Sequence, residues 1–183
     1  MTEDMFFALI DPVFKELGAV PGVGEDYVQP PLDVLRYYRR GVRLSWVPWL
    51  GRSLSVTAVI RQPVDLGFSR GEYQKLLTRV ATAVDGRFPP WGRDGGLTLG
   101  MLAIVLTPEP IGPGDDAILR EVVSGRALPR QRAVPLGIIR ANLGQEALSF
   151  ALASGPEGVF SEPVALADVL TGHLRRFVPL MEV

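Results

Sequence analysis

The chain has 183 residues but no cysteine and only one histidine. Without cysteine it can form no disulfide bond, no thiolate nucleophile and no zinc site that depends on thiolates. His173 would have to be the base of any Ser-His-Asp triad, and a metal site with two histidines is impossible. Because His173 falls at the margin of the apolar stripe of the last predicted helix, we interpret it as a packed, hydrogen-bonded side chain.

The sequence also lacks a long apolar run and a signal for export. Its longest strongly apolar run, residues 97–106, is about half of the roughly 20 residues that a bilayer-spanning helix needs. The chain begins Met1-Thr-Glu-Asp, which places acids where a signal peptide needs basic residues, and Pro12 interrupts the apolar segment that follows. We therefore expect no transmembrane segment and a cytoplasmic location.

Catalytic and nucleotide-binding motifs are missing as well. There is no Gly-x-Ser-x-Gly elbow, and the glycine turn at 92–96 precedes a predicted strand, whereas phosphate loops follow a strand and open a helix. The turn at 112–116 opens a helix, but its two aspartates would repel a phosphate. We predict no catalytic residue, no metal site and no cofactor, although the acids Asp65, Asp94 and Glu109 at strand ends could still converge in space.

The charges nearly balance. Of the 19 basic residues only Lys15 and Lys75 are lysines, so the other 17 are arginines, and the formal net charge is −1. A chain with this net charge has no protein-wide cationic field. Binding to a nucleic acid or to acidic lipids would have to come from a local patch, and residues 36–52 are the only serious candidate.

Glycine and proline punctuate the chain at intervals that suit short elements. A Pro/Gly-rich loop is predicted at 19–31, and Pro48 places its strand at a sheet edge because proline lacks an amide donor. After one or two N-terminal helices the predicted order is ββαβαββα. The predicted elements are helices at 6–17 and 32–40, strands at 42–49 and 54–61, a helix at 69–86, a strand at 97–106, a helix at 115–125, strands at 133–141 and 147–153, and a helix at 161–177.

This pattern predicts one globular domain over residues 1–183, of α+β or α/β class. Helices that separate strands require crossover connections, so we expect a mixed five-stranded sheet with helices on one or both of its faces. The apolar stripes are expected to meet in one core. Its predicted members are Leu76, Leu77, Val80, Leu102, Ile104, Leu106, Ile138, Leu148, Phe150, Val169 and Leu170.

The segment 36–52 combines cationic side chains with flat rings. Its candidate partner-binding residues are Arg36, Tyr37, Arg39, Arg40, Arg43, Trp49 and Arg52. Trp, Tyr and Arg dominate binding hot spots, so the segment suits a protein partner with an acidic face. A single-stranded nucleic acid could instead bind by stacking its bases on the same rings. A purely structural interpretation, with the rings buried and the arginines solvated, has equal weight.

Our first hypothesis is a non-enzymatic cytoplasmic binding or adaptor domain that acts through protein contacts, with another protein or with a second copy as a homodimer. The alternative is a nucleic-acid-associated protein that uses the arginine and aromatic patch at 36–52. The third hypothesis is an enzyme whose site assembles from dispersed Asp, Arg and Ser residues.

Overall fold

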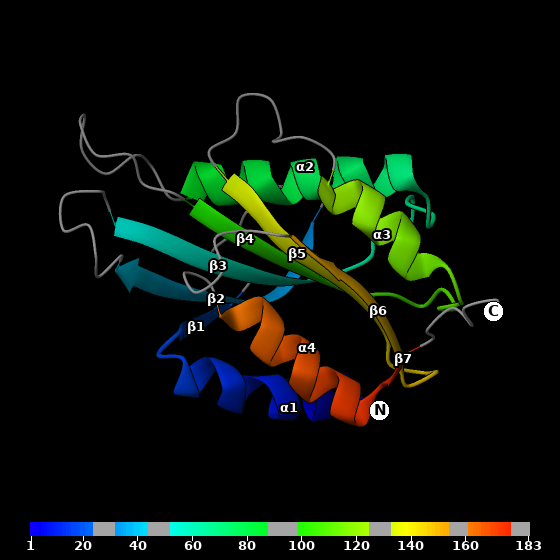
Figure 1. The fold of residues 1–183 in the computed structure, drawn as a ribbon, viewed down its shortest axis with the longest axis horizontal. Coiled ribbons are helices and arrows are strands. Elements are labelled where there is room, and N and C mark those ends of the chain that lie inside the picture. The colour runs from blue at the N-terminus through cyan, green and yellow to red at the C-terminus, as the bar shows by residue number, and fades with distance from the viewer. Residues whose placement is uncertain (24–31, 44–51, 88–98, 125–132, 154–160, 177–183) are drawn as a thin grey trace, which may run out of the picture.

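The computed structural model describes residues 1–23, 32–43, 52–87, 99–124, 133–153 and 161–176. These residues form a mixed α/β fold with four helices and seven strands, which confirms the predicted class but corrects the predicted five strands (Figure 1). The elements are α1 (Glu3–Glu16), β1 (Val20–Val23), β2 (Asp33–Arg43), β3 (Arg52–Arg61), α2 (Arg70–Arg87), β4 (Leu99–Leu106), α3 (Asp115–Ser124), β5 (Ala133–Asn142), β6 (Ala147–Leu152), α4 (Glu162–His173) and β7 (Arg175–Arg176).

The seven strands lie in the sheet in their sequence order. Strands β1, β2 and β3 pair antiparallel, whereas β3, β4 and β5 pair parallel. Beyond them β6 is antiparallel to β5, and the two-residue β7 is parallel to β6. Parallel neighbours need crossover connections, and α2 and α3 supply the two crossovers within the parallel part.

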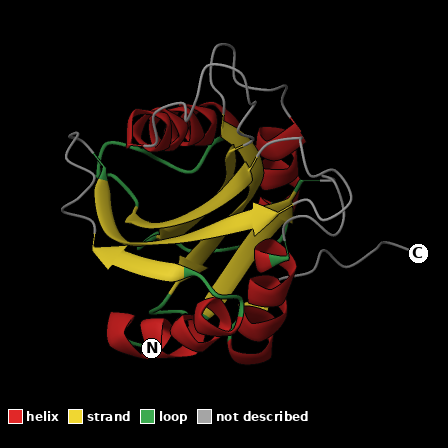
Figure 2. Cartoon of the chain, turned by 90° about the vertical axis from the view of Figure 1, so that its left-hand side faces the viewer, coloured by secondary structure: helices red, strands yellow, loops and turns green. Residues whose placement is uncertain are grey.

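Helices cover both faces of the sheet. Helices α2 and α3 lie on one face and α1 and α4 on the other (Figures 1 and 2). Each face buries its own apolar core: Leu77 and Ile138 belong to the α2–α3 side, and Phe14, Leu102 and Leu170 to the α1–α4 side. The expectation of one core is therefore wrong, because the sheet separates the predicted members into two clusters.

Two sequence predictions fail around β2. The segment 32–40 was expected to be a helix but is the main part of β2, which pairs with β3 from Asp33 to Arg43. The expected loop at 19–31 contains β1, which pairs with residues 36–39 of β2. Residues 24–31 and most of the predicted strand 42–49, Pro48 included, lie outside the described residues.

A buried arginine joins the carboxyl ends of the parallel strands to the helices above them. Arg140, near the end of β5, has no exposed surface. Its Nη1 donates to Asp115 Oδ2 at 2.6 Å and to the Pro110 carbonyl at 3.2 Å, while Nη2 donates to Glu109 Oε2 at 3.2 Å. Its Nε donates to the Tyr73 hydroxyl at 3.1 Å. Two carboxylates and a phenol therefore replace the water that this cation has lost.

One of the three predicted strand-end acids, Glu109, lies in this cluster. Glu109 does meet a second acid, Asp115, but the two converge on Arg140. Asp65 lies elsewhere, 4.0 Å from Arg79, and Asp94 is outside the described residues. The convergence is an ion-pair cluster that neutralises a buried cation.

Replacing Arg140 with Met should lower the free energy of unfolding by about 3 to 5 kcal/mol, because it leaves Asp115 and Glu109 without their cation in a largely buried site. The matched control is Arg70→Met, which removes the exposed pair with Glu121 and should cost about 0 to 1 kcal/mol. Urea unfolding of both variants measures the difference. Equal losses in the two variants would contradict the role of Arg140.

Tyr73 should make the stability of the fold sensitive to alkaline pH. Burial raises the pKa of Tyr73 to about 12, from an ordinary value of 10.0. Between these two values the unfolded chain loses the phenol proton and the folded chain keeps it, so the free energy of unfolding should fall as pH rises from about 10 to 12. Urea unfolding across this pH range measures the fall in the free energy of unfolding. The fall should be smaller in Tyr73→Phe than in the parent by on the order of 2 kcal/mol. The same fall in both proteins would contradict the prediction.

Candidate functional site

Strand β2 divides the predicted cationic segment between the two faces of the sheet. Side chains alternate along a strand, and Tyr37 packs in the α2–α3 core while Tyr38 packs in the α1–α4 core. Arg36 and Arg40 share the face of Tyr38, since they reach residues of α1 and α4. The described candidate residues on β2 therefore lie on both faces of the sheet and do not form one patch.

Two of these arginines are paired with acids. Arg36 Nη1 lies 2.8 and 2.7 Å from the two carboxylate oxygens of Asp11 on α1. Arg40 Nε lies 2.7 Å from Oε1 of Glu162, a buried residue at the start of α4, as an ion pair without hydrogen-bond geometry. Each arginine therefore connects one helix to the sheet: Arg36 connects α1, and Arg40 connects α4.

The other candidates differ in exposure. Tyr37 is 6% exposed, whereas the Arg39 side chain is exposed and makes no hydrogen bond or ion pair within the part of the chain that the structure describes. Arg43 and Arg52 are register partners in the ladder between β2 and β3. Their side chains and the whole of Trp49 lie outside the described residues.

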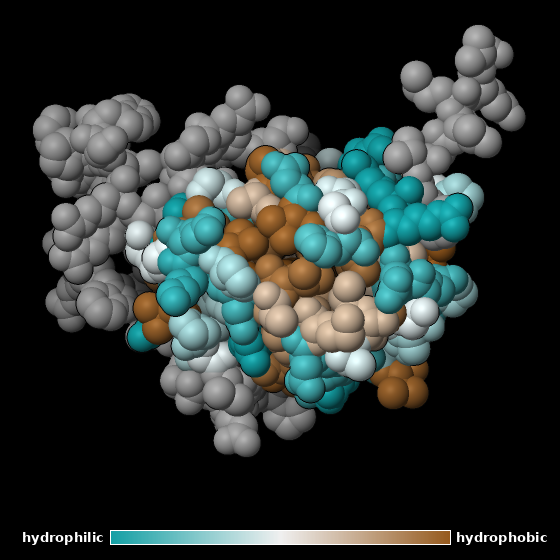
Figure 3. All heavy atoms as spheres, turned by 90° about the horizontal axis from the view of Figure 1, so that it is seen from below, coloured by the Kyte–Doolittle hydropathy of each residue, from teal (hydrophilic) through white to brown (hydrophobic). Residues whose placement is uncertain are grey.

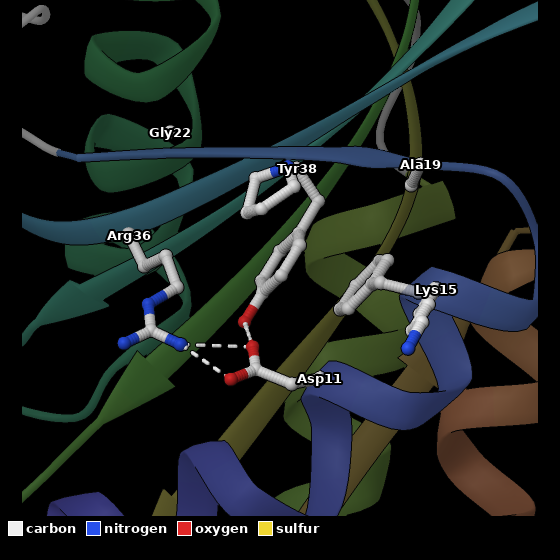
Figure 4. Close-up of a pocket in the computed structure, with 8 residues that line it drawn as sticks. Asp11, Lys15, Ala19, Gly22, Arg36 and Tyr38 are labelled. Atoms are coloured by element: carbon white, nitrogen blue, oxygen red, sulfur yellow. Dashed lines mark hydrogen bonds and ion pairs between the residues drawn. The ribbon is translucent and has the colours of Figure 1, made fainter.

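A pocket of about 510 Å³ opens between α1, β1 and β2, and one predicted residue, Arg36, lines it (Figure 4). Asp11, Phe14 and Lys15 lie on one side of α1, because residues three and four positions apart share a face of a helix. The described lining residues are Asp11, Phe14, Lys15, Ala19, Pro21, Gly22, Arg36 and Tyr38. The pocket was not predicted, because no sequence pattern relates residues of α1 to a strand 25 positions away.

Asp11 is the centre of the pocket's hydrogen bonds. Besides its two contacts with Arg36, its Oδ1 accepts a hydrogen bond from the Tyr38 hydroxyl at 2.5 Å (Figure 4). Burial raises the pKa of Tyr38 well above its ordinary value, and the hydrogen bond to Asp11 raises it further. Tyr38 therefore stays a neutral donor at physiological pH, and the Asp11 carboxylate is compensated from two sides.

The remaining charge of the pocket is positive. Lys15 follows Asp11 by one helical turn, is exposed, and makes no side-chain hydrogen bond or ion pair with any described residue. Arg36 directs Nη1 to Asp11, its guanidinium also interacts with the Tyr38 hydroxyl, and its Cζ lies 4.0 Å from the centroid of the Phe7 ring. Two cations and one carboxylate give the lining a formal net charge of +1.

A second feature lies on the outer surface of α1 and α4. Seen from this side, apolar side chains gather in the middle of the face and hydrophilic ones surround them (Figure 3). Met5 on α1 and Val164 on α4 are each 56% exposed. Leu9, Ala165 and Val169 on the same helices are partly buried against the core beneath. We call these five residues the α1–α4 face; sequence analysis missed it because Met5 and Val164 lie outside the predicted stripes.

The charged residues near this face are mainly acidic. Asp4 and Glu16 on α1 and Asp168 on α4 are exposed, and their carboxylates make no hydrogen bond or ion pair with the described residues. His173, the last residue of α4, is also exposed, and its Nδ1 lies 2.9 Å from the Val169 carbonyl. The predicted hydrogen bond of His173 is therefore present, but the ring is not packed in the core.

Two kinds of site are not found within the described ranges. No three His, Cys, Asp or Glu side chains gather there as they would around a metal ion. None of the described helices combines the length and the apolar content that a bilayer crossing needs.

Gly22→Ala should destabilise the fold, because an added Cβ would lie 2.2 Å from Cζ of the buried Tyr37 ring across the β1–β2 ladder. Overpacking of this kind costs about 1 to 3 kcal/mol. Gly41→Ala in β2 is the matched control: its Cβ would have no neighbour within 4 Å, so the change should be neutral or stabilise by roughly 0.5 to 1 kcal/mol. Thermal unfolding compares the two. A Gly22→Ala variant as stable as the parent would show that β1 is not held by this contact.

Comparison of the chain with protein-family models, with curated proteins and with solved structures finds no match. Function therefore has to be inferred from the pocket and from the α1–α4 face.

Proposed function

We propose that this chain is a cytoplasmic, non-enzymatic binding domain that acts through contact with another protein, and that the partner docks on the α1–α4 face. The observation that supports this proposal is the exposed apolar centre of that face (Figure 3). Met5 and Val164 each leave more than half of their surface in water, although α1 and α4 pack on the apolar core beneath them. Apolar side chains that cluster on a surface and are rimmed by polar ones are typical of protein interaction sites.

The charges on the two helices indicate the partner's chemistry. Asp4, Glu16 and Asp168 are exposed carboxylates without partners among the described residues. A segment with an apolar stripe flanked by lysine or arginine would cover the apolar centre and complement these acids. A second copy of this chain would instead bring the same acids against each other, so we favour a different protein over a homodimer.

The nucleic-acid alternative has less support from the structure. Binding to phosphates depends on cations that release counterions, but Arg36 and Arg40 are already paired with Asp11 and Glu162. Of the described candidates in the segment, only Arg39 is an exposed arginine whose side chain makes no ion pair with described residues.

Introducing charge on the α1–α4 face should abolish partner binding without unfolding the domain. In Met5→Glu/Val164→Glu both altered side chains are already 56% exposed, so we expect a loss of affinity of at least about tenfold, or about 1.4 kcal/mol, with little change in melting temperature. Val64→Glu is the matched control, because Val64 is fully exposed in the connection between β3 and α2. Titration calorimetry with a purified partner, first recovered from cell extract by the parent chain, measures the loss.

Two outcomes would contradict the proposal. Equal affinity of the partner for the parent and the double variant would show that the α1–α4 face is not the docking surface. Concentration-dependent dimerisation in sedimentation velocity that the double variant loses would assign the face to a second copy, against the charge argument.

A further inference from the structure

The α1–α4 face is built from the sides of two helices that contact each other and run in opposite directions (Figure 1). On α1 the residues Met5, Leu9, Pro12 and Glu16 follow one another at intervals of four, three and four positions. Residues at these intervals share one side of a helix. The face therefore consists of side chains that project from helical backbone.

The main chain of this face is already hydrogen bonded. Inside a helix each N–H and each C=O bonds to a residue four positions away, as the Ala165 N–H does to the Ser161 carbonyl at 3.1 Å. In the first turn of α1, the Met5 N–H donates instead to Thr2 Oγ1 at 3.3 Å. By this pattern Val164, in the first turn of α4, is the one face residue whose amide lacks a helical partner.

This decides which kind of element can cover the face. An extended segment needs partners for its own N–H and C=O groups, and it finds them at the edge of a sheet. On the outer side of two helices those groups would be buried against apolar side chains without partners. An α-helix bonds its own main chain, and it can cover the face with an apolar stripe.

The exposed acids indicate what flanks that stripe. Glu16 ends the row of residues on α1, and Asp168 follows Val164 by four positions on α4. Neither carboxylate makes a hydrogen bond or ion pair with a described residue. Lys15, an exposed cation of α1, lies about 100° around the helix from Glu16, on the side that lines the pocket. Basic side chains beside the apolar stripe would therefore meet carboxylates.

We propose that the element that docks on the α1–α4 face is an amphipathic α-helix whose apolar stripe is flanked by lysine or arginine. This inference rests on the proposed docking of a protein at that face. Helix α1 has 14 residues and is about 21 Å long, so a partner helix of about four turns would cover its length.

Two synthetic peptides of equal composition separate a helix from a strand. Each consists of leucine and lysine and has about 15 residues, with leucine at i, i+3, i+4 and i+7 in the helical peptide and at every second position in the alternating one. In the ¹⁵N-labelled parent chain, the helical peptide should shift the Leu9, Ala165 and Val169 amide signals saturably and leave Val64 unchanged. The alternating peptide should bind at least about tenfold more weakly.

Charge reversal tests the basic flank of the helix. Asp168→Lys should weaken binding of the helical peptide at least about fivefold, because repulsion replaces attraction. Glu121→Lys is the matched control, since Glu121 is an exposed carboxylate of α3 on the other side of the sheet, and it should leave binding unchanged. Both side chains are exposed, so both variants should melt close to the parent's temperature.

Three results would overturn the helix proposal: an alternating peptide that binds as tightly as the helical one, shifts confined to residues outside α1 and α4, or unchanged affinity in Asp168→Lys. The partner recovered from cell extract separates this failure from a failure of the proposed function. If that partner loses affinity for Met5→Glu/Val164→Glu while neither peptide shifts the face signals, a protein docks there through another element and the basic helix is wrong. Displacement of the partner by the helical peptide supports the proposal.

Discussion

The guanidinium group of Arg140, which has lost all contact with water, constrains one whole side of this fold. Removing such a charge from water costs several kcal/mol unless each donor finds a partner in good geometry. Its partners come from α2, from the connection after β4 and from α3, and the Phe68 ring lies 4.0 Å from its Cζ. The carboxyl ends of the parallel strands, where α/β proteins commonly bind ligands, are therefore filled by groups that this cation requires.

On the opposite side of the sheet, ion pairs also join helices to strands, but their arginines keep part of their contact with water. Arg36 and Arg40 lie on the same face of β2. Arg36 pairs with Asp11 of α1, and Arg40 pairs with Glu162 of α4. These two ion pairs connect helices that are far apart in the sequence to one strand. Lys15 and the exposed apolar side chains of α1 and α4 take part in neither ion pair.

Elements with a full apolar stripe or a continuous apolar run could be predicted from the sequence, as β4 and α2 show. The failure at β2 has a physical cause: Arg36, Arg39, Arg40 and Arg43 fall at helical spacing, and only pairing with β3 separates them by strand alternation. Strands of four and two residues carry no recognisable period, so β1 and β7 were missed. The pocket was missed because Asp11 lies 25 positions from Arg36, and no spacing rule relates residues of a helix to a strand so distant.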